Sequence, residues 1–157
     1  MSLYPSSSTS GRWFALLGWL VVIFTFSTDS FSSAETSRIL GPALKFLFPS
    51  LAPEQLEFLH LVCRKAGHVL EYFVLGVLAW RALRADMSRP RNLKLRVLAA
   101  VFVVAVAFSD EFHQFFVPSR TSSLVDVGYD SIGGMIALLF MSRLRNETRT
   151  LHSHPLL

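Results

Sequence analysis

The chain has 157 residues, which is enough for one domain, and its charged residues (17% of the total) are clustered rather than spread over solvated faces. The formal net charge of +4 does not indicate nucleic-acid binding, because the basic residues flank apolar segments and no nucleic-acid motif accompanies them. The single cysteine, Cys63, excludes an internal disulfide and a cysteine-based metal cluster.

The N-terminal region predicts a tail and then a first transmembrane helix. Residues 1–12 are rich in serine and predict a flexible tail, and residues 13–28 are almost entirely apolar. The competing interpretation is a cleaved signal peptide, with Ser32-Ser33-Ala34 as the small-residue cleavage site. We favour a retained helix, because the segment before the apolar core is long and weakly charged.

A mixed segment follows, in which we expect a short amphipathic helix lying at the membrane interface. Ile39, Leu40, Leu44 and Leu47 recur at helical spacing, and Pro49 ends the pattern. Pro53 then occupies the favoured first turn of another helix, which is predicted to continue into the second membrane span.

The predicted fold is all-α: an integral membrane bundle of four transmembrane helices with a short interfacial helix between the first and the second. The four spans lie at about residues 13–28, 64–81, 96–116 and 124–142. Together they form a membrane domain over residues 13–142, and a cytoplasmic tail follows at 143–157. A soluble four-helix bundle is the alternative, but residues 13–26 and 97–108 are apolar all round rather than on one face.

The distribution of basic residues predicts the orientation. The N-terminal tail, the loop between the second and third spans and the C-terminal tail hold ten of the 15 lysines and arginines. The positive-inside rule therefore predicts a multi-pass protein of the cell membrane with both termini in the cytoplasm. The polar ends of the second, third and fourth spans then face the extracytoplasmic side.

Polar side chains gather at these outer ends, and ionisable groups at membrane depth usually mark a functional site. A spacing of three or four puts Asp110, His113 and Gln114 on one helical face, while Glu111 points about 100° away. We expect one shared pocket built from three spans and the last outer loop. Its candidate residues are Lys65, His68, Glu71, Tyr72, Asp110, Glu111, His113, Gln114, Arg120, Asp126 and Asp130.

Three ordered motifs of this chain resemble the VanZ-like family. They are Arg64-Lys65-x2-His68-x2-Glu71-Tyr72, then Ser109-Asp110-Glu111-x-His113-Gln114-Phe115-x2-Pro118-x-Arg120, and then Asp126-Val127 with Gly133. The resemblance implies a small multi-span membrane protein of the cell envelope, linked to resistance to glycopeptides such as teicoplanin. It implies no particular reaction. Where it leads us to expect asparagine in the fourth span, this chain carries Asp130, which adds a negative charge.

As an enzyme, the chain would process a lipid-linked envelope substrate. His68 or His113 would be the general base, oriented by Glu71 or Asp110. Arg120 and Lys65 would hold a phosphate or carboxylate. The predicted catalytic residues are His68, Glu71, Asp110, Glu111, His113 and Asp126, and the predicted substrate-binding residues are Lys65, Tyr72, Gln114, Arg120 and Asp130.

Three other interpretations remain open. The pocket could belong to a non-catalytic binder or carrier of membrane lipid or glycopeptide, which as a transporter would require a homo-oligomer. The ion pairs could be purely structural. A metal site built on His68 and His113 is the third, although Asp126 and Asp130 could also hold a divalent cation. We predict no cofactor and no resident metal, because a histidine flanked by carboxylates is more often a polar core residue than a ligand.

Overall fold

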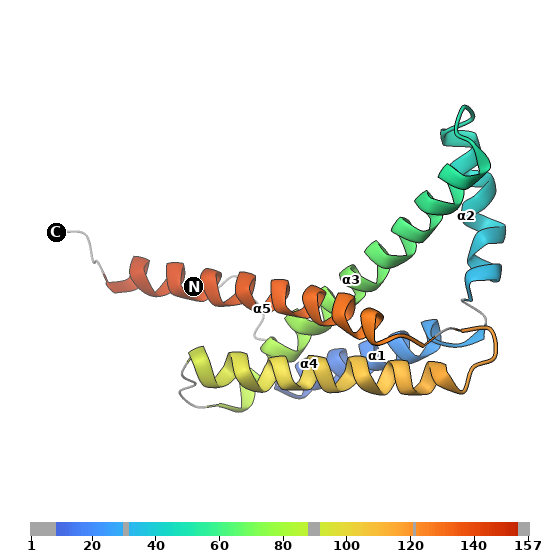
Figure 1. Ribbon diagram of the computed structural model, residues 1–157. Helices are drawn as coiled ribbons and strands as arrows, with labels where there is room; N and C mark the ends of the chain where they lie inside the picture. The colour runs from blue at the N-terminus through green and yellow to red at the C-terminus, as the bar shows by residue number, and fades with distance from the viewer. Residues whose placement is uncertain (1–8, 30–31, 88–91, 121, 154–157) are drawn as a thin grey trace.

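The computed structural model describes residues 9–29, 32–87, 92–120 and 122–153, and this part of the chain is all-α, as predicted (Figure 1). Its five helices are α1 (Thr9–Phe26), α2 (Ser33–Leu47), α3 (Pro53–Asp86), α4 (Asn92–Phe115) and α5 (Leu124–Ser153). They correspond in order to the predicted first span, the amphipathic helix and the three later spans. Residues 1–8 of the predicted N-terminal tail lie outside the described part, and α5 continues through most of the predicted C-terminal tail.

Local side-chain bonds fix where the helices begin. The hydroxyl of Ser32 accepts a hydrogen bond from the Glu35 N–H at 3.3 Å and so caps α2. At the start of α3, the side-chain oxygen of Gln55 accepts from the Ala52 N–H at 2.9 Å. The Ser123 hydroxyl accepts from the Val125 N–H at 3.1 Å before α5. These contacts satisfy main-chain donors that have no partner within a helix.

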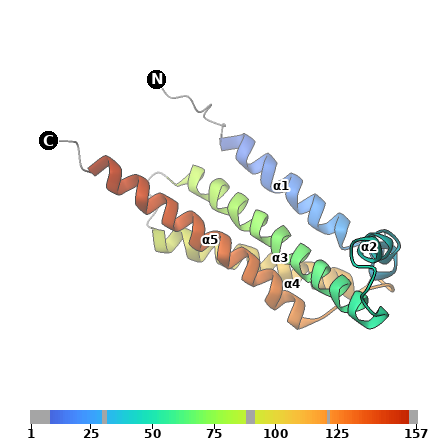
Figure 2. The ribbon, with the colours of Figure 1, turned by 90° about the horizontal axis from the view of Figure 1, so that it is seen from above.

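Four helices run side by side, and α2 stands at one end of them (Figure 2). The start of α1, the end of α3, the start of α4 and the end of α5 lie at the opposite end. The N-terminal half of α3 leaves the bundle and rises beside α2 (Figure 1). The connections α1–α2 and α4–α5 are therefore at one end of the bundle, which is the arrangement that places the predicted polar residues together.

Glycines allow α3, α4 and α5 to approach closely. A Cβ added at Gly133 of α5 would overlap the main-chain carbonyl of Val69 in α3. One added at Gly76 of α3 would overlap the backbone of Gly134, and Gly134 itself lies against Val103 of α4. Small residues at such an interface let helix backbones approach closely, and Gly133 serves this purpose between α3 and α5.

The buried core lies between these helices. Each of the four helices contributes buried apolar side chains to it, among them Leu16, Ile23, Tyr72, Leu75, Val103 and Val127. The indole N–H of Trp19 donates to the main-chain carbonyl of Glu71 at 3.0 Å and ties α1 to α3. This bond fixes α1 beside the polar part of α3.

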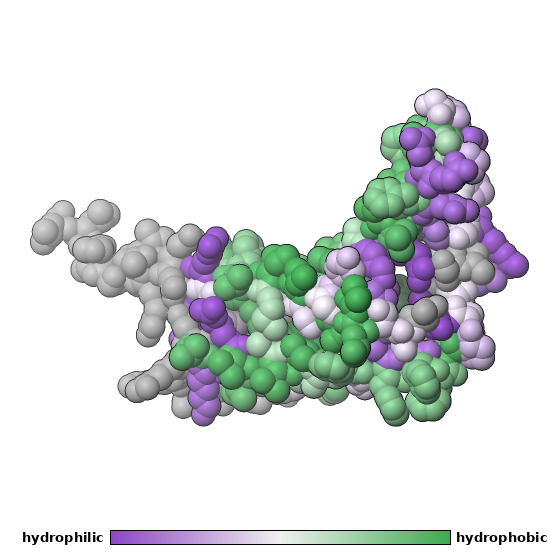
Figure 3. All heavy atoms as spheres, viewed as in Figure 1, coloured by the Kyte–Doolittle hydropathy of each residue, from purple (hydrophilic) through white to green (hydrophobic). Residues whose placement is uncertain are grey.

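Two of the described helices are long and apolar enough to cross a membrane by length and composition: α1 and the part of α5 from Leu124 to Arg145. A signal sequence or a buried core helix can have the same composition, so this supports a membrane protein only weakly. Two of the four predicted spans meet the criterion. In Figure 3, hydrophobic side chains cover the middle of the bundle over α4 and α5, between hydrophilic groups near both ends.

Candidate functional site

Two adjoining cavities open at the end of the bundle beside α2. The first has a volume of about 420 Å³ and a mainly apolar wall that includes Trp19, Phe26, Leu40, Leu70 and Val74. The second, of about 430 Å³, has a more polar wall that includes Lys65, Gln114 and Asp126. Arg64, His68 and Arg120 line both cavities. The site therefore has an apolar part and a polar part that meet at these three basic side chains.

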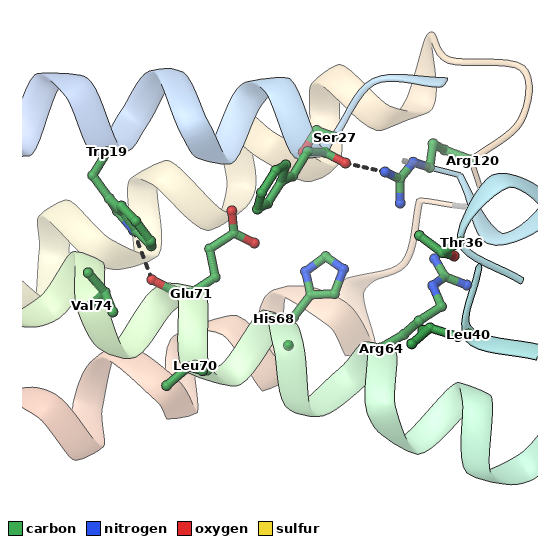
Figure 4. Close-up of a pocket in the computed structure, with 12 residues that line it drawn as sticks. Trp19, Ser27, Thr36, Leu40, Arg64, His68, Leu70, Glu71, Val74 and Arg120 are labelled. Carbon is green, nitrogen blue, oxygen red and sulfur yellow. Dashed lines mark hydrogen bonds between the residues drawn. The ribbon is translucent and has the colours of Figure 1, made fainter. Parts of the chain in front are cut away.

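The basic side chains come from α3 and from the loop between α4 and α5. His68 and Arg64 lie one helical turn apart on α3, and Arg120 approaches them from the other side (Figure 4). Neither arginine forms an ion pair with a carboxylate of the described residues. Burial, and next the charge of Arg64, lower the pKa of the Arg120 guanidinium from its ordinary value. The two guanidinium groups are thus close enough to repel each other.

Arg120 also holds the end of α1. Its guanidinium donates hydrogen bonds to the main-chain carbonyl of Phe26 and, at 3.2–3.3 Å, to that of Thr28. These carbonyls lie at or beyond the last turn of α1, so the bonds join the loop before α5 to the end of this helix. We expected Arg120 to bind substrate, and the geometry gives it a structural bond as well.

His68 contacts an acid different from the one we expected. Its Nδ1 lies 3.4 Å from Oδ1 of Asp130 in α5, without the geometry of a hydrogen bond. Glu71, one turn along α3, lines the apolar cavity beside it. His68 therefore lines both cavities and lies next to Asp130, which is fully buried.

Asp110 is held by donors from two helices. The hydroxyl of Ser27, just after α1, donates to Oδ1, and the side-chain amide of Gln114 donates to Oδ2 at 3.0 Å. Both side-chain oxygens of Asp110 are therefore already bonded, and neither bond comes from a histidine. The predicted pairing of Asp110 with His113 is not seen among the described hydrogen bonds.

Glu111 lies closer to Asp110 and Asp130 than its rotation about α4 suggested. It is buried, and its Oε2 accepts a hydrogen bond from the Ser123 N–H at 2.7 Å. Oxygen atoms of Asp110, Glu111 and Asp130 all lie within 4.8 Å of one another. Glu111 therefore faces the start of α5 and belongs to the same polar cluster as Asp110.

Lys65 and Asp126 form an ion pair between α3 and α5 at the edge of the polar cavity. The ammonium also lies 5.6 Å from the centre of the Tyr129 ring. Both partners are partly buried. The pair joins the two helices across the site.

His113 is separate from the cavities. Its ring packs edge-on against Phe24 of α1, with 6.0 Å between the ring centres, and it is absent from the walls of both cavities. Among the described residues, its Nδ1 has no hydrogen-bond partner. The geometry therefore favours His68 over His113 as the histidine that meets a ligand.

The predicted residues fall into three groups. Those that line a cavity are Lys65, His68, Glu71, Gln114, Arg120 and Asp126. Tyr72, Asp110, Glu111 and Asp130 are buried outside the two cavity walls, and His113 contacts α1. We had not placed Ser27 or Arg64 among the site residues. Ser27 directly follows the long apolar segment, and Arg64 stands beside Lys65 in the first family motif. Both positions could therefore have been predicted as site residues from the sequence.

Comparison with known families gives one match. The family model described as VanZ/LLP1 matches residues 12–145. No curated protein and no solved structure matches the chain. The matched range contains the whole site and every helix except the ends of α1 and α5.

Proposed function

Since the chain belongs to the VanZ/LLP1 family, we propose that it is a four-span membrane protein that binds a lipid-linked phosphate of the cell envelope in its two adjoining cavities. The spans would be α1, the C-terminal half of α3, α4 and the first two thirds of α5. The site would face the extracytoplasmic side, and the chain would act in glycopeptide resistance.

The outer surface of α4 supports the membrane assignment. Val97, Val101, Phe108 and Phe112 recur at spacings of four and seven, and all are more than half exposed. A stripe of large exposed apolar side chains on a soluble monomer would be an aggregation hazard, whereas in a bilayer it contacts lipid. By this argument α4 also spans the membrane, in addition to α1 and α5, which meet the criterion of length and composition.

The charge distribution supports the orientation. Six basic residues, Arg81, Arg84, Arg89, Arg91, Lys94 and Arg96, lie between the apolar parts of α3 and α4. The positive-inside rule puts this connection in the cytoplasm. The cavities lie at the opposite end of the bundle, and hence on the extracytoplasmic side.

The observation that carries the ligand assignment is the pair of arginines at the junction of the cavities. Arg64 and Arg120 are cations that face one space and have no carboxylate partner there among the described residues. A phosphate between them would replace their repulsion by charge-assisted hydrogen bonds. The apolar cavity would receive the start of a hydrocarbon chain. A lipid-linked phosphate has both parts.

As an enzyme, the site would use His68 as a general base. This ring lines both cavities beside the arginines, and Asp130 behind it would stabilise the imidazolium that forms when it takes a proton. As a non-catalytic binder, the same pocket would hold the lipid or a glycopeptide unchanged. Ser27, the hydroxyl in the apolar cavity, already donates to Asp110, which favours binding over nucleophilic attack by this chain.

Binding to the purified full chain in nanodiscs tests the proposal. We would titrate a polyprenyl phosphate and, as the matched ligand, the polyprenol that lacks the phosphate. Arg64→Ala should weaken binding of the phosphate by about 10-fold or more, the usual worth of a charge-assisted hydrogen bond, and leave the polyprenol unaffected. Arg38→Ala is the matched control, because Arg38 pairs with Glu35 on the exposed surface of α2.

Equal affinity for the phosphate and the alcohol, or equal losses in Arg64→Ala and Arg38→Ala, would refute the phosphate assignment. Mass spectrometry of the lipid after incubation separates the two forms of the proposal, since only an enzyme changes its mass. The biological test is glycopeptide susceptibility of a sensitive Gram-positive host that expresses wild type, Arg64→Ala or Arg38→Ala. Only Arg64→Ala should fail to protect.

A further inference from the structure

Three buried carboxylates meet in the described interior of the bundle without a basic partner strong enough to balance them. Asp110, Glu111 and Asp130 expose at most 6% of their surfaces, and one oxygen of each lies within 4.8 Å of the others. No lysine or arginine of the described residues forms an ion pair with any of them, and His68 alone lies within ion-pair distance, at 3.4 Å from Asp130. Such charges are costly in an interior, so they are paired with a cation, neutralised by a proton or bound to a metal.

Unused polar atoms surround the same point. Neither side-chain oxygen of Asp130, a fully buried residue, has a hydrogen-bond partner among the described residues, and Oε1 of Glu111 also has none. The hydroxyl of Tyr72, also fully buried, is likewise without a hydrogen-bond partner among the described residues. Buried polar atoms are nearly always bonded, so the three carboxylate oxygens of this cluster that accept no hydrogen bond, one of them 3.4 Å from Nδ1 of His68, point to a ligand there.

The other carboxylate oxygens of Asp110 and Glu111 are held in place by hydrogen bonds, as is usual for carboxylates that bind a metal. Ser27 and Gln114 hold Asp110, and the Ser123 N–H holds Glu111. Metal ligands are commonly fixed by such outer hydrogen bonds. Lys65 does not neutralise the cluster, because it is paired with Asp126.

We propose that Asp110, Glu111 and Asp130 bind a divalent cation, with calcium preferred over magnesium. The ligand atoms are all oxygens, which suits hard cations rather than zinc or copper. Ca²⁺ accepts roughly six to eight oxygens in a flexible geometry, whereas Mg²⁺ demands near-ideal octahedral coordination. One oxygen of each carboxylate lies within 4.8 Å of the others, which is inside the span of about 5.2 Å that two ligands of one Ca²⁺ can have. Asp130 also lies behind His68 in the proposed ligand site, but binding of the cation can be measured without any lipid.

Calorimetric titration of Ca²⁺ into the full chain in detergent, after removal of metal by a chelator, tests the proposal without any lipid. We expect saturable binding of one ion per chain with a Kd of about 1 mM or below, and weaker binding of Mg²⁺. Asp130→Asn should weaken Ca²⁺ binding by more than about 10-fold. Gln114→Ala, which frees one oxygen of Asp110, should weaken it by about 10-fold.

Glu57→Gln is the matched control, since Glu57 is an exposed carboxylate on α3, and it should bind Ca²⁺ like wild type. If Asp130→Asn does not fold, Glu111→Gln takes its place. Folded wild-type protein that binds less than about a tenth of an equivalent at 10 mM Ca²⁺ overturns the proposal. So does a cluster variant that binds within about twofold of the control, because the ion would then lie elsewhere.

Discussion

Ser27, the first residue beyond α1, donates a hydrogen bond to the carboxylate of Asp110 in α4, although 83 positions separate them in the chain. Both residues are buried, so water cannot replace a lost partner. The bond orients Asp110 within the carboxylate cluster and joins the first helix to the motif-bearing fourth helix. The apolar first segment is therefore part of the site.

Replacing this hydroxyl should destabilise the bundle. Ser27→Ala leaves a buried carboxylate oxygen without its donor, and we expect the free energy of unfolding to fall by about 1–3 kcal/mol. Thermal unfolding in detergent measures the change. Thr25→Ala is the control, since the Thr25 hydroxyl bonds only to the main chain of its own helix at an exposed position, and it should change stability little. Equal losses would show that Ser27 is not a special partner of Asp110.

A methyl group at Gly133 should separate α3 from α5. Gly133→Ala places its Cβ in the main-chain carbonyl of Val69, and the resulting overpacking should cost about 1–3 kcal/mol of stability. Gly128→Ala on the same helix meets nothing within 4 Å and should be neutral or stabilising by up to about 1 kcal/mol. Unfolding midpoints of the two variants give the comparison, and a destabilised Gly128→Ala would contradict the packing described.

The ion pair of Lys65 and Asp126 should show measurable coupling. A double-mutant cycle with Lys65→Met and Asp126→Asn should give an interaction free energy of about 0.5–2 kcal/mol, because both groups are only partly exposed. Chemical denaturation of the four proteins measures it. An interaction free energy of zero would mean that the pair is solvent-screened and does not hold α3 against α5.

Arg120 should matter for folding through its geometry as well as its charge. Arg120→Lys keeps the positive charge but cannot reach the carbonyls of Phe26 and Thr28 together with a planar group. We expect a loss of about 1–2 kcal/mol in stability. Arg64→Lys, the control, removes no hydrogen bond or ion pair to another described residue and should leave the melting temperature unchanged. A stable Arg120→Lys would assign this residue to ligand binding alone.

The single native cysteine can report the proposed topology. Cys63 is partly exposed on α3 beside Arg64, so a membrane-impermeant maleimide should label it in intact cells. Arg84→Cys in a Cys63→Ser background places the thiol at the exposed, opposite end of α3 and should react only after permeabilisation. The reverse labelling pattern would invert the orientation and move the site to the cytoplasmic side.

The amino-acid sequence was enough to predict the helices and the end of the bundle at which their polar residues gather. Apolar periodicity and the proline at position 53 act over a few residues, so the order and approximate bounds of α1 to α5 could be predicted. The connections between helices then brought the polar ends of α3, α4 and α5 together. The family motifs lie on these ends, and the family match agrees with them.

The partners of the polar groups, in contrast, depend on the tertiary structure. His68 lies beside Asp130, Lys65 forms an ion pair with Asp126, and the ring of His113 packs against Phe24. These choices depend on how far each helix is rotated about its axis and how closely α5 approaches α3 at Gly133. Spacing along one helix fixes directions within that helix alone, because the rotation between helices is set by packing of side chains far apart in the sequence.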